Sequence, residues 1–395
     1  MVENKFENTP EKTFKLGKVS LISFSHLVHD IYTAFLAPIL PLLIDKLSMS
    51  YSMAGFLILI LRIPAIISPL IGLYAERMST RYFVIFAPAV TAIAMSFVGN
   101  APSYLILCII LLLAGLSSAF YHVPSPVMIR NLSGNKVGTG MSFYMVGGEL
   151  ARTLGPLIIL TAVSIWGLEG SFRVIFIGLA ATILLFIQIR NIPVRENSNK
   201  NQKPPTLMLV LKKQKDVFII SGALVLSKSF MILTLTSFLP TYMTTKGSSI
   251  WLAGAALSVI ELAGAAGTFL SGSLSDKIGR RNMLLFTTLL APVFMLIFVY
   301  SSGWILFPIL VIMGLLVFAV SPVVMAYVLE NEKEYPATAN SIFMALNFGV
   351  GSIVALFIGF LGDSIDLDMT YIASAILSLV GLPFIFKMPS KNNVM

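Results

Sequence analysis

Charged residues are scarce in this chain of 395 residues, and cysteine is nearly absent. Lys, Arg, Asp and Glu together make up 11% of the sequence, against roughly 25% in an ordinary soluble domain. Apolar residues make up 57%, which is more than a soluble core of this size can bury, so the composition excludes an ordinary soluble enzyme. The single cysteine, Cys108, excludes an internal disulfide and a thiolate metal cluster. We interpret it as a packing residue.

Long apolar segments fill most of the chain. Each has about 20 residues, which is enough to cross a hydrocarbon layer about 30 Å thick. We predict twelve transmembrane helices, at residues 18–43, 50–75, 82–99, 103–128, 138–165, 172–190, 217–243, 250–275, 282–300, 303–329, 337–361 and 369–388. The predicted fold class is therefore an all-α integral membrane protein. The polar residues 1–17 lack the apolar stretch of a cleavable signal, so we expect this tail to be retained.

Basic residues predict the orientation in the membrane. Lys46, Arg173 and Lys246 fall in loops on one side, whereas every other Lys or Arg outside the spans falls in a tail or in a loop on the other side. Because basic loops stay in the cytoplasm, we predict a multi-pass protein of the cytoplasmic membrane with both termini cytoplasmic. This asymmetry accounts for the formal net charge of +9, so nucleic acid is not an expected partner.

A polar linker at residues 191–216 divides the spans into an N-terminal half, 18–190, and a C-terminal half, 217–388, with tails at 1–17 and 389–395. The linker ends in apolar residues followed by lysines, which is typical of a short amphipathic helix at the membrane surface.

The two halves carry related segments. Gly72, Glu76, Arg77 and Arg81 follow the second span as Gly272, Asp276, Lys277 and Arg281 follow the eighth, and the second copy also has Gly279 and Arg280. Two pseudo-symmetric six-helix halves in one orientation are the plan of a large transporter class.

Those repeated segments resemble the cytoplasmic signature of the major facilitator superfamily, and further motifs resemble its fosmidomycin resistance proteins. These motifs are Ser25-His26-Leu27-Val28-His29-Asp30, Phe120-Tyr121-His122, Val146-Gly147-Gly148 through Leu154-Gly155-Pro156, and Leu226-Ser227-Lys228. The resemblance covers nearly the whole chain and implies a transporter that works by alternating access. It implies that the signature loops gate the cytoplasmic side and that Gly155 and Pro156 belong to an antiporter motif.

Six charged side chains lie near the middle of predicted spans. They are Asp30, Arg62, Glu149, Arg152, Lys228 and Glu261. An unpaired charge at this depth costs about 3 kcal/mol on insertion scales, so six of them would exceed a typical folding free energy. They must therefore face one another or water, and three acids with three bases allow the set to pair without a net buried charge. Either the pairs only hold helices together or they serve transport, and intramembrane charges favour transport.

Histidines beside an acid indicate proton coupling. His26, His29 and Asp30 are spaced i, i+3 and i+4, so we expect them on one helical face. Imidazole and a buried carboxyl exchange protons near neutral pH. We therefore predict that these three residues and Glu149 carry protons. The alternatives are a histidine that only hydrogen-bonds to a neighbouring helix, and a metal site completed by His122.

Substrate contact is predicted for Arg62, His122, Arg152, Lys228 and Glu261. In the superfamily, the fifth and eighth spans face each other across the halves. Arg152 is therefore expected to exchange between Glu149 in its own half and Glu261 in the other.

We predict a monomeric proton antiporter that exports a small polar or amphiphilic drug or metabolite and has no cofactor and no enzymatic activity. Its expected partners are protons, the substrate and the lipid bilayer. The alternatives are proton-coupled import of a small organic anion, a metal-ion transporter, an intramembrane metalloenzyme and a non-transporting sensor. No phosphate-binding loop occurs in the sequence, which disfavours transport driven by ATP.

Overall fold

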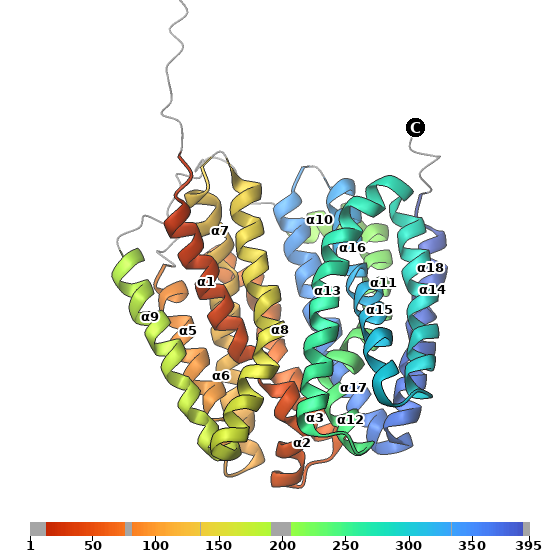
Figure 1. Cartoon of the computed structure of the whole chain (residues 1–395). Helices are drawn as coiled ribbons and strands as arrows, with labels where there is room; N and C mark the ends of the chain where they lie inside the picture. Colours follow the sequence, from red (N-terminus) through yellow and green to blue (C-terminus); the bar gives the residue numbers. More distant parts are fainter. Residues whose placement is uncertain (1–12, 76–80, 135, 191–206, 333, 390–395) are drawn as a thin grey trace, which may run out of the picture.

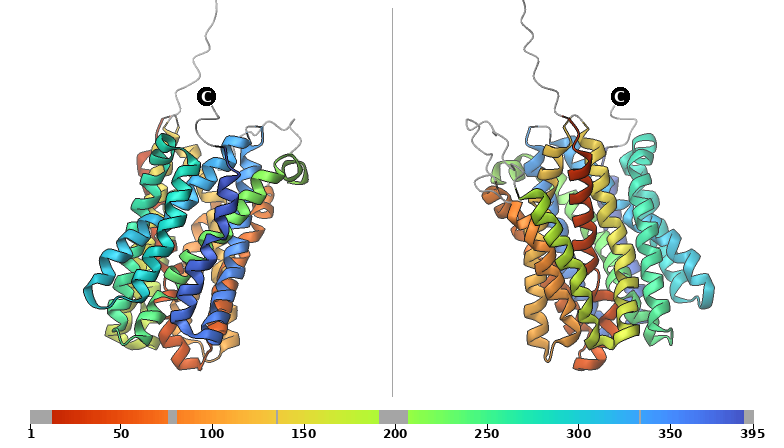
Figure 2. Two further views of the ribbon diagram at one scale, coloured as in Figure 1. Left: turned by 90° about the vertical axis from the view of Figure 1, so that its right-hand side faces the viewer. Right: turned by 60° about the vertical axis from the view of Figure 1, so that its left-hand side comes forward.

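A computed structural model describes residues 13–75, 81–134, 136–190, 207–332 and 334–389. In this part of the chain the regular elements are helices that run between two ends of the molecule (Figures 1 and 2). The N-terminal half contains α1 (Leu16–Thr33), α2 (Leu36–Leu47), α3 (Tyr51–Arg62), α4 (Ser68–Ala75), α5 (Arg81–Ser96), α6 (Tyr104–His122), α7 (Pro124–Leu132), α8 (Val137–Gly170) and α9 (Ile175–Ile189).

The C-terminal half follows the same plan. It contains α10 (Leu207–Lys213), α11 (Lys215–Ser237), α12 (Leu239–Thr245), α13 (Ile250–Ile278), α14 (Arg280–Val299), α15 (Leu306–Phe318), α16 (Val320–Asn331), α17 (Pro336–Leu377) and α18 (Leu382–Phe386). The short helix α10 lies in the segment of the linker for which an amphipathic helix was predicted.

Ten apolar helical segments of the described chain are long enough to cross a membrane, and two of them have 51 and 49 residues. Each of these two turns back at one residue with non-helical backbone angles, Gly167 (φ 74°, ψ 170°) and Asp366 (φ 66°, ψ 173°). Glycine adopts a positive φ without strain. Asp366 accepts a hydrogen bond from the backbone N–H of Met369 at 2.9 Å, which caps the helix after the turn. Each segment therefore makes two spans, and the prediction of twelve transmembrane helices is confirmed.

Among the residues that the structure describes, the two halves share a hydrophobic core at one end of the molecule. We call the end where α1 begins the tail end and the opposite end the far end. One hydrophobic cluster combines residues of both halves, including Leu57 of α3 with Phe238, Ala355 and Ile358. Two other clusters belong to single halves: one spans residues 14–189 and the other residues 210–388.

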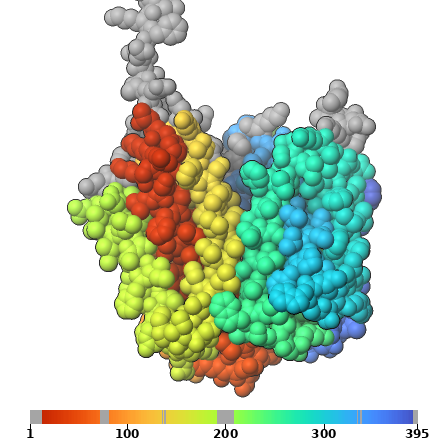
Figure 3. Space-filling model, in the orientation of Figure 1, coloured from red at the N-terminus to blue at the C-terminus, as the bar shows by residue number. Residues whose placement is uncertain are grey.

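The space-filling view agrees with this division of the core. At the tail end the surface is hollowed between α8 and α13, and toward the far end these helices close on each other (Figure 3). The halves are therefore parted at the tail end and packed together at the far end.

Candidate functional site

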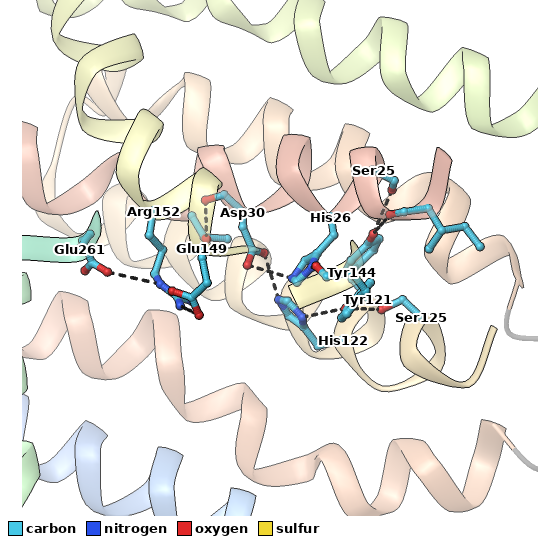
Figure 4. A network of polar contacts seen from close by, with 12 residues as sticks. Ser25, His26, Asp30, Tyr121, His122, Ser125, Tyr144, Glu149, Arg152 and Glu261 are labelled. Carbon is cyan, nitrogen blue, oxygen red and sulfur yellow. Dashed lines mark hydrogen bonds and ion pairs between the residues drawn. The ribbon is translucent and has the colours of Figure 1, made fainter. Parts of the chain in front are cut away.

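Asp30 lies between two histidines inside the N-terminal half (Figure 4). Its Oδ2 is 3.2 Å from Nε2 of His26, one turn earlier on α1, and its Oδ1 is 3.1 Å from Nε2 of His122 at the end of α6. The carboxylate is buried, with 9% of its side chain exposed. A buried carboxylate is stable only with such partners, so helices α1 and α6 together make the site.

Helix α8 fixes the orientation of the His26 ring. Nδ1 of His26 lies 2.7 Å from the backbone oxygen of Tyr144, and the two rings stack with centroids 3.9 Å apart. Gly148 leaves the space for this ring, because a Cβ at this position would lie 2.7 Å from Cε1 of His26. A carbonyl oxygen only accepts hydrogen bonds, so Nδ1 must carry a proton and donate it.

This tautomer determines where the next proton lies. With Nδ1 protonated, a neutral His26 would point the lone pair of Nε2 at the carboxylate oxygen 3.2 Å away. Two buried acceptors at that distance repel each other, so a proton must lie between them. It belongs either to an imidazolium beside a carboxylate or to a carboxylic acid beside a neutral imidazole. The pair of His26 and Asp30 therefore shares one proton in this conformation.

His122 connects this buried pair to the space between the halves. Its side chain is 38% exposed although it contacts Asp30. Its Nδ1 lies 3.5 Å from the hydroxyl of Tyr144, which in turn lies 2.6 Å from Oγ of Ser125. His122 thus links the buried carboxylate of Asp30, and through it His26, to an accessible side chain.

A second polar group bridges the two halves. Arg152 on α8 pairs through Nη2 with Glu149 on the same helix, and its Nε lies 3.3 Å from Oε2 of Glu261 on α13. Glu261 is buried, with 8% of its side chain exposed, whereas 39% of Arg152 is exposed. Arg152 also lies within electrostatic reach of Asp30. It contacts both acids at once here, whereas the sequence predicted an exchange between them.

Only some of the six charges make the pairing that the sequence allows, in the part of the chain that the structure describes. Asp30 pairs with histidines, and Arg62 and Lys228 have no carboxylate within ion-pair distance among the residues that the structure describes. Lys228 is buried and donates a hydrogen bond to Ser321 of α16. Arg62 lies close enough to Lys228 for the two positive charges to repel each other. Glu149 and Glu261 both contact Arg152, and Glu261 also lies within electrostatic reach of Arg62.

His29 lies beside the same group, with its ring centroid 5.6 Å from that of His122. It is completely buried, and its ring stacks on Tyr121 with centroids 4.3 Å apart. The partners of Asp30 are His26, four residues earlier, and His122 from α6. The predicted shared face therefore holds for His26 and Asp30, while His29 packs beside them.

The three side chains His26, Asp30 and His122 are also the described group in which metal ligands could be sought, since their donor atoms lie within 4.8 Å of one another. Their N–O contacts of 3.2 and 3.1 Å have the length of ordinary hydrogen bonds. Oδ1 of Asp30 has no hydrogen-bond partner among the described residues, so the group can hold a proton or a metal ion.

The second copy of the signature makes its contacts within its own half. Arg280 lies 2.5 Å from Asp276 and 2.8 Å from Glu330 of α16. Gly279 joins α13 to α14 with φ 92°, a conformation that favours glycine. Arg281 lies over the ring of Phe386 at 5.4 Å. The described contacts of Arg280 and Arg281 therefore do not join the halves at the tail end.

The first copy is only partly visible. Glu76 and Arg77 lie outside the described residues, Gly72 lies in α4, and Arg81 begins α5 with its guanidinium 5.1 Å over the ring of Tyr82. Lys277 lies in the last turn of α13.

In the predicted antiporter motif, Gly155 lets α8 approach α1, since a Cβ there would lie 2.7 Å from Cβ of Ala34. Pro156 lies inside α8.

The sequence assigned no role at this site to Tyr144, Tyr121 or Ser125. Tyr144 acts through its backbone oxygen, which no side-chain pattern reveals, although its position one turn before Gly148 could have indicated contact with α1. Tyr121 donates a hydrogen bond to Ser25 of α1 at 3.0 Å.

Twelve membrane-spanning helices in two related halves, with buried charges between them, define a secondary transporter. Comparison with protein families agrees: the model of the Major Facilitator Superfamily matches residues 22–355. The chain belongs to this family.

Its curated relatives include the fosmidomycin resistance protein of Escherichia coli (strain K12), 26% identical over 96% of this chain and 94% of that protein. The uncharacterized MFS-type transporter YfnC of Bacillus subtilis (strain 168) is also 26% identical, over 95% of this chain and 93% of its own length.

Solved structures share the fold. A bacterial homolog of the human lysosomal transporter Spinster, in an inward-facing and unoccupied conformation, has a TM-score of 0.80 at 15% identity, covering 96% of this chain and 97% of its own. The nucleoside transporter NupG has a TM-score of 0.70 at 16% identity, covering 94% of this chain and 99% of its own.

Proposed function

We propose that this transporter is a proton antiporter that exports a small polar or amphiphilic compound. The observation that carries the proposal is the proton that His26 and Asp30 must share, because the backbone oxygen of Tyr144 fixes the ring tautomer. A site that always holds a proton in one conformation and reaches accessible space through His122 suits the binding and release of protons during transport.

Coupling to the halves follows from Arg152. It bridges Glu149 and Glu261 and lies within electrostatic reach of Asp30. Loss of the shared proton leaves a net negative charge at the pair of His26 and Asp30, which attracts Arg152 and weakens its contact with Glu261. The protonation state thus biases how the halves pack, which is the requirement for alternating access.

The direction of transport rests on orientation and on the relative. We place the tail end in the cytoplasm because the basic loops lie there, so the parted halves represent an inward-facing state that loads substrate from the cell. The name of the fosmidomycin resistance protein indicates that this relative protects cells from a toxic compound.

Expression in a pump-deficient bacterial strain tests the proposal. Cells that make the protein should survive a higher concentration of fosmidomycin or of another compound in an antibiotic panel, and Asp30→Asn should abolish this protection. The matched control is Asp45→Asn, an exposed acid on α2. Protection that persists in Asp30→Asn cells at equal expression contradicts the proposal.

Arg62 and Lys228 favour a second candidate, the transport of an organic anion. Two close positive charges from different halves, without a carboxylate partner among the described residues, are stabilised by a bound carboxylate or phosphate group. Such a substrate fits import as well as export. Growth of expressing cells on a scarce organic acid as the carbon source would favour import, and resistance would favour export.

A further inference from the structure

Asp363 occupies an unfavourable place in its own helix. It lies near the end of the first span of α17, three residues before the turn at Asp366. A helix carries partial negative charge at its C-terminal end, so a carboxylate there destabilises the helix that bears it. Asp363 is also exposed rather than buried in a compensating network. Its own half therefore gives no electrostatic reason for this acid.

The beginning of α3, in the other half, supplies the missing partner. The backbone N–H groups of Tyr51 and Ser52 each donate a hydrogen bond of 2.7 Å to the two carboxylate oxygens of Asp363. The N–H of Met53 goes to Oγ of Ser50, the N-cap residue, at 3.2 Å. The first N–H groups of an α-helix lack partners within the helix. Asp363 thus completes the cap of a helix that belongs to the opposite half.

Close backbone contact surrounds this cap. A Cβ at Gly359 would lie 2.2 Å from the backbone oxygen of Tyr51, and one at Gly55 would lie 2.6 Å from that of Ala355. Further along the far end, Nε1 of Trp251 on α13 donates a 2.8 Å hydrogen bond to Ser164 on α8. The carboxylate therefore lies at one edge of the packed seam between the halves.

We propose that Asp363 is a positioning residue that holds the far end shut by capping α3 across the seam. Separation of the halves there leaves two helix N–H groups without this acceptor and leaves the carboxylate beside the negative end of its own helix. The contact thus favours the conformation that is closed at the far end. The inference rests on the proposed alternating access but not on proton coupling or on a substrate.

The labelling rate of a buried cysteine tests this role. Ile358 is completely buried in the core that the halves share, so Ile358→Cys in a Cys108→Ser background reports opening of the far end. The protein, reconstituted in nanodiscs, is treated with a fluorescent maleimide in the absence of any substrate. Adding Asp363→Asn, which keeps the shape and removes the charge, should raise the labelling rate about fivefold to tenfold.

Asp368→Asn is the matched control. Asp368 lies on the other side of the turn and accepts hydrogen bonds from Tyr242 and Lys246, all within the C-terminal half. Its loss should leave the labelling rate within twofold of the parent. The proposal is overturned if Asp363→Asn labels no faster than the parent. It is also overturned if Asp363→Asn and Asp368→Asn accelerate labelling equally. Asp363→Ser, which has a shorter side chain, should accelerate labelling as much as Asp363→Asn. A parental labelling rate in Asp363→Ser also counts against the proposal.

Discussion

Glu261→Gln isolates the one ion pair at the centre of the membrane that joins the halves in the described part of the chain. Glutamine keeps the shape of the side chain and removes the charge that lies 3.3 Å from Nε of Arg152. The two side chains form an ion pair, and their contact does not have the geometry of a hydrogen bond. Because 39% of Arg152 is exposed, solvent screening limits an ion pair of this kind to about 1 kcal/mol. A free-energy difference of about 1 kcal/mol changes the ratio of the conformation parted at the tail end to the conformation closed there about fivefold.

Spin labels at the tail end measure the ratio. Exposed positions Arg130 on α7 and Asn331 on α16 belong to different halves, and cysteines placed there in a Cys108→Ser background carry the labels. The pair of Arg152 and Glu261 is present while the tail end is parted, so Glu261→Gln should shift the distance distribution toward shorter values at pH 8.

Glu149→Gln is the control, since Glu149 contacts Arg152 within the same helix and not across the seam. It should leave the distribution closer to wild type than Glu261→Gln does. Distributions for Glu261→Gln that match wild type at both pH 6 and pH 8 would show that this pair only holds the helices together, and the gating role of Arg152 would have to be abandoned.

Three further changes test other parts of the site and fold. Gly148→Ala places a carbon 2.7 Å from Cε1 of His26, so it should abolish protection against the exported compound while the protein still elutes as one species in detergent. Lys228→Gln should weaken substrate binding by about 1.5 to 3 kcal/mol if one charged hydrogen bond to an anion is lost, and equal affinity by calorimetry would make this lysine structural. Burial alone raises the pKa of Glu332, which follows α16, but hydrogen bonds from the backbone N–H groups of Tyr335 and Glu334 outweigh it and lower the pKa. A carboxylate with a lowered pKa stabilises the fold above its unfolded pKa of about 4.3, and this contribution is lost as the pH falls through the folded value. Glu332→Gln should therefore melt at a lower temperature than wild type at pH 7 and approach it near pH 3, and equal melting at pH 7 would refute the assignment.

The sequence predicts most of the fold because the bilayer constrains it so strongly. A run of apolar residues that is long enough to span the membrane has few structures other than a helix. The turns at Gly167 and Asp366 were located as the gaps between the fifth and sixth spans and between the eleventh and twelfth. The i, i+4 spacing of His26 and Asp30 likewise predicted a contact within one helix.

The rest depends on contacts between helices, which spacing along the chain does not encode. The tautomer of His26 is fixed by a backbone oxygen 118 residues away. Arg152 contacts both Glu149 on its own helix and Glu261 on α13. In the sequence Asp363 is an ordinary acid in a predicted loop, and only the structure shows that it accepts a hydrogen bond from the start of α3. Composition predicts the set of polar groups, but three-dimensional packing decides their partners.

Transport along an imposed pH gradient tests the central claim, that the Asp30 site couples protons to substrate movement. The protein is reconstituted in proteoliposomes, and accumulation of radiolabelled fosmidomycin, or of the compound to which expression gives the strongest resistance, is followed with the lumen acidic. We predict that wild type and Asp45→Asn accumulate the compound and that Asp30→Asn does not, although Asp30→Asn still exchanges it at equal pH on both sides. Accumulation by Asp30→Asn at the wild-type rate along the same gradient would contradict the account.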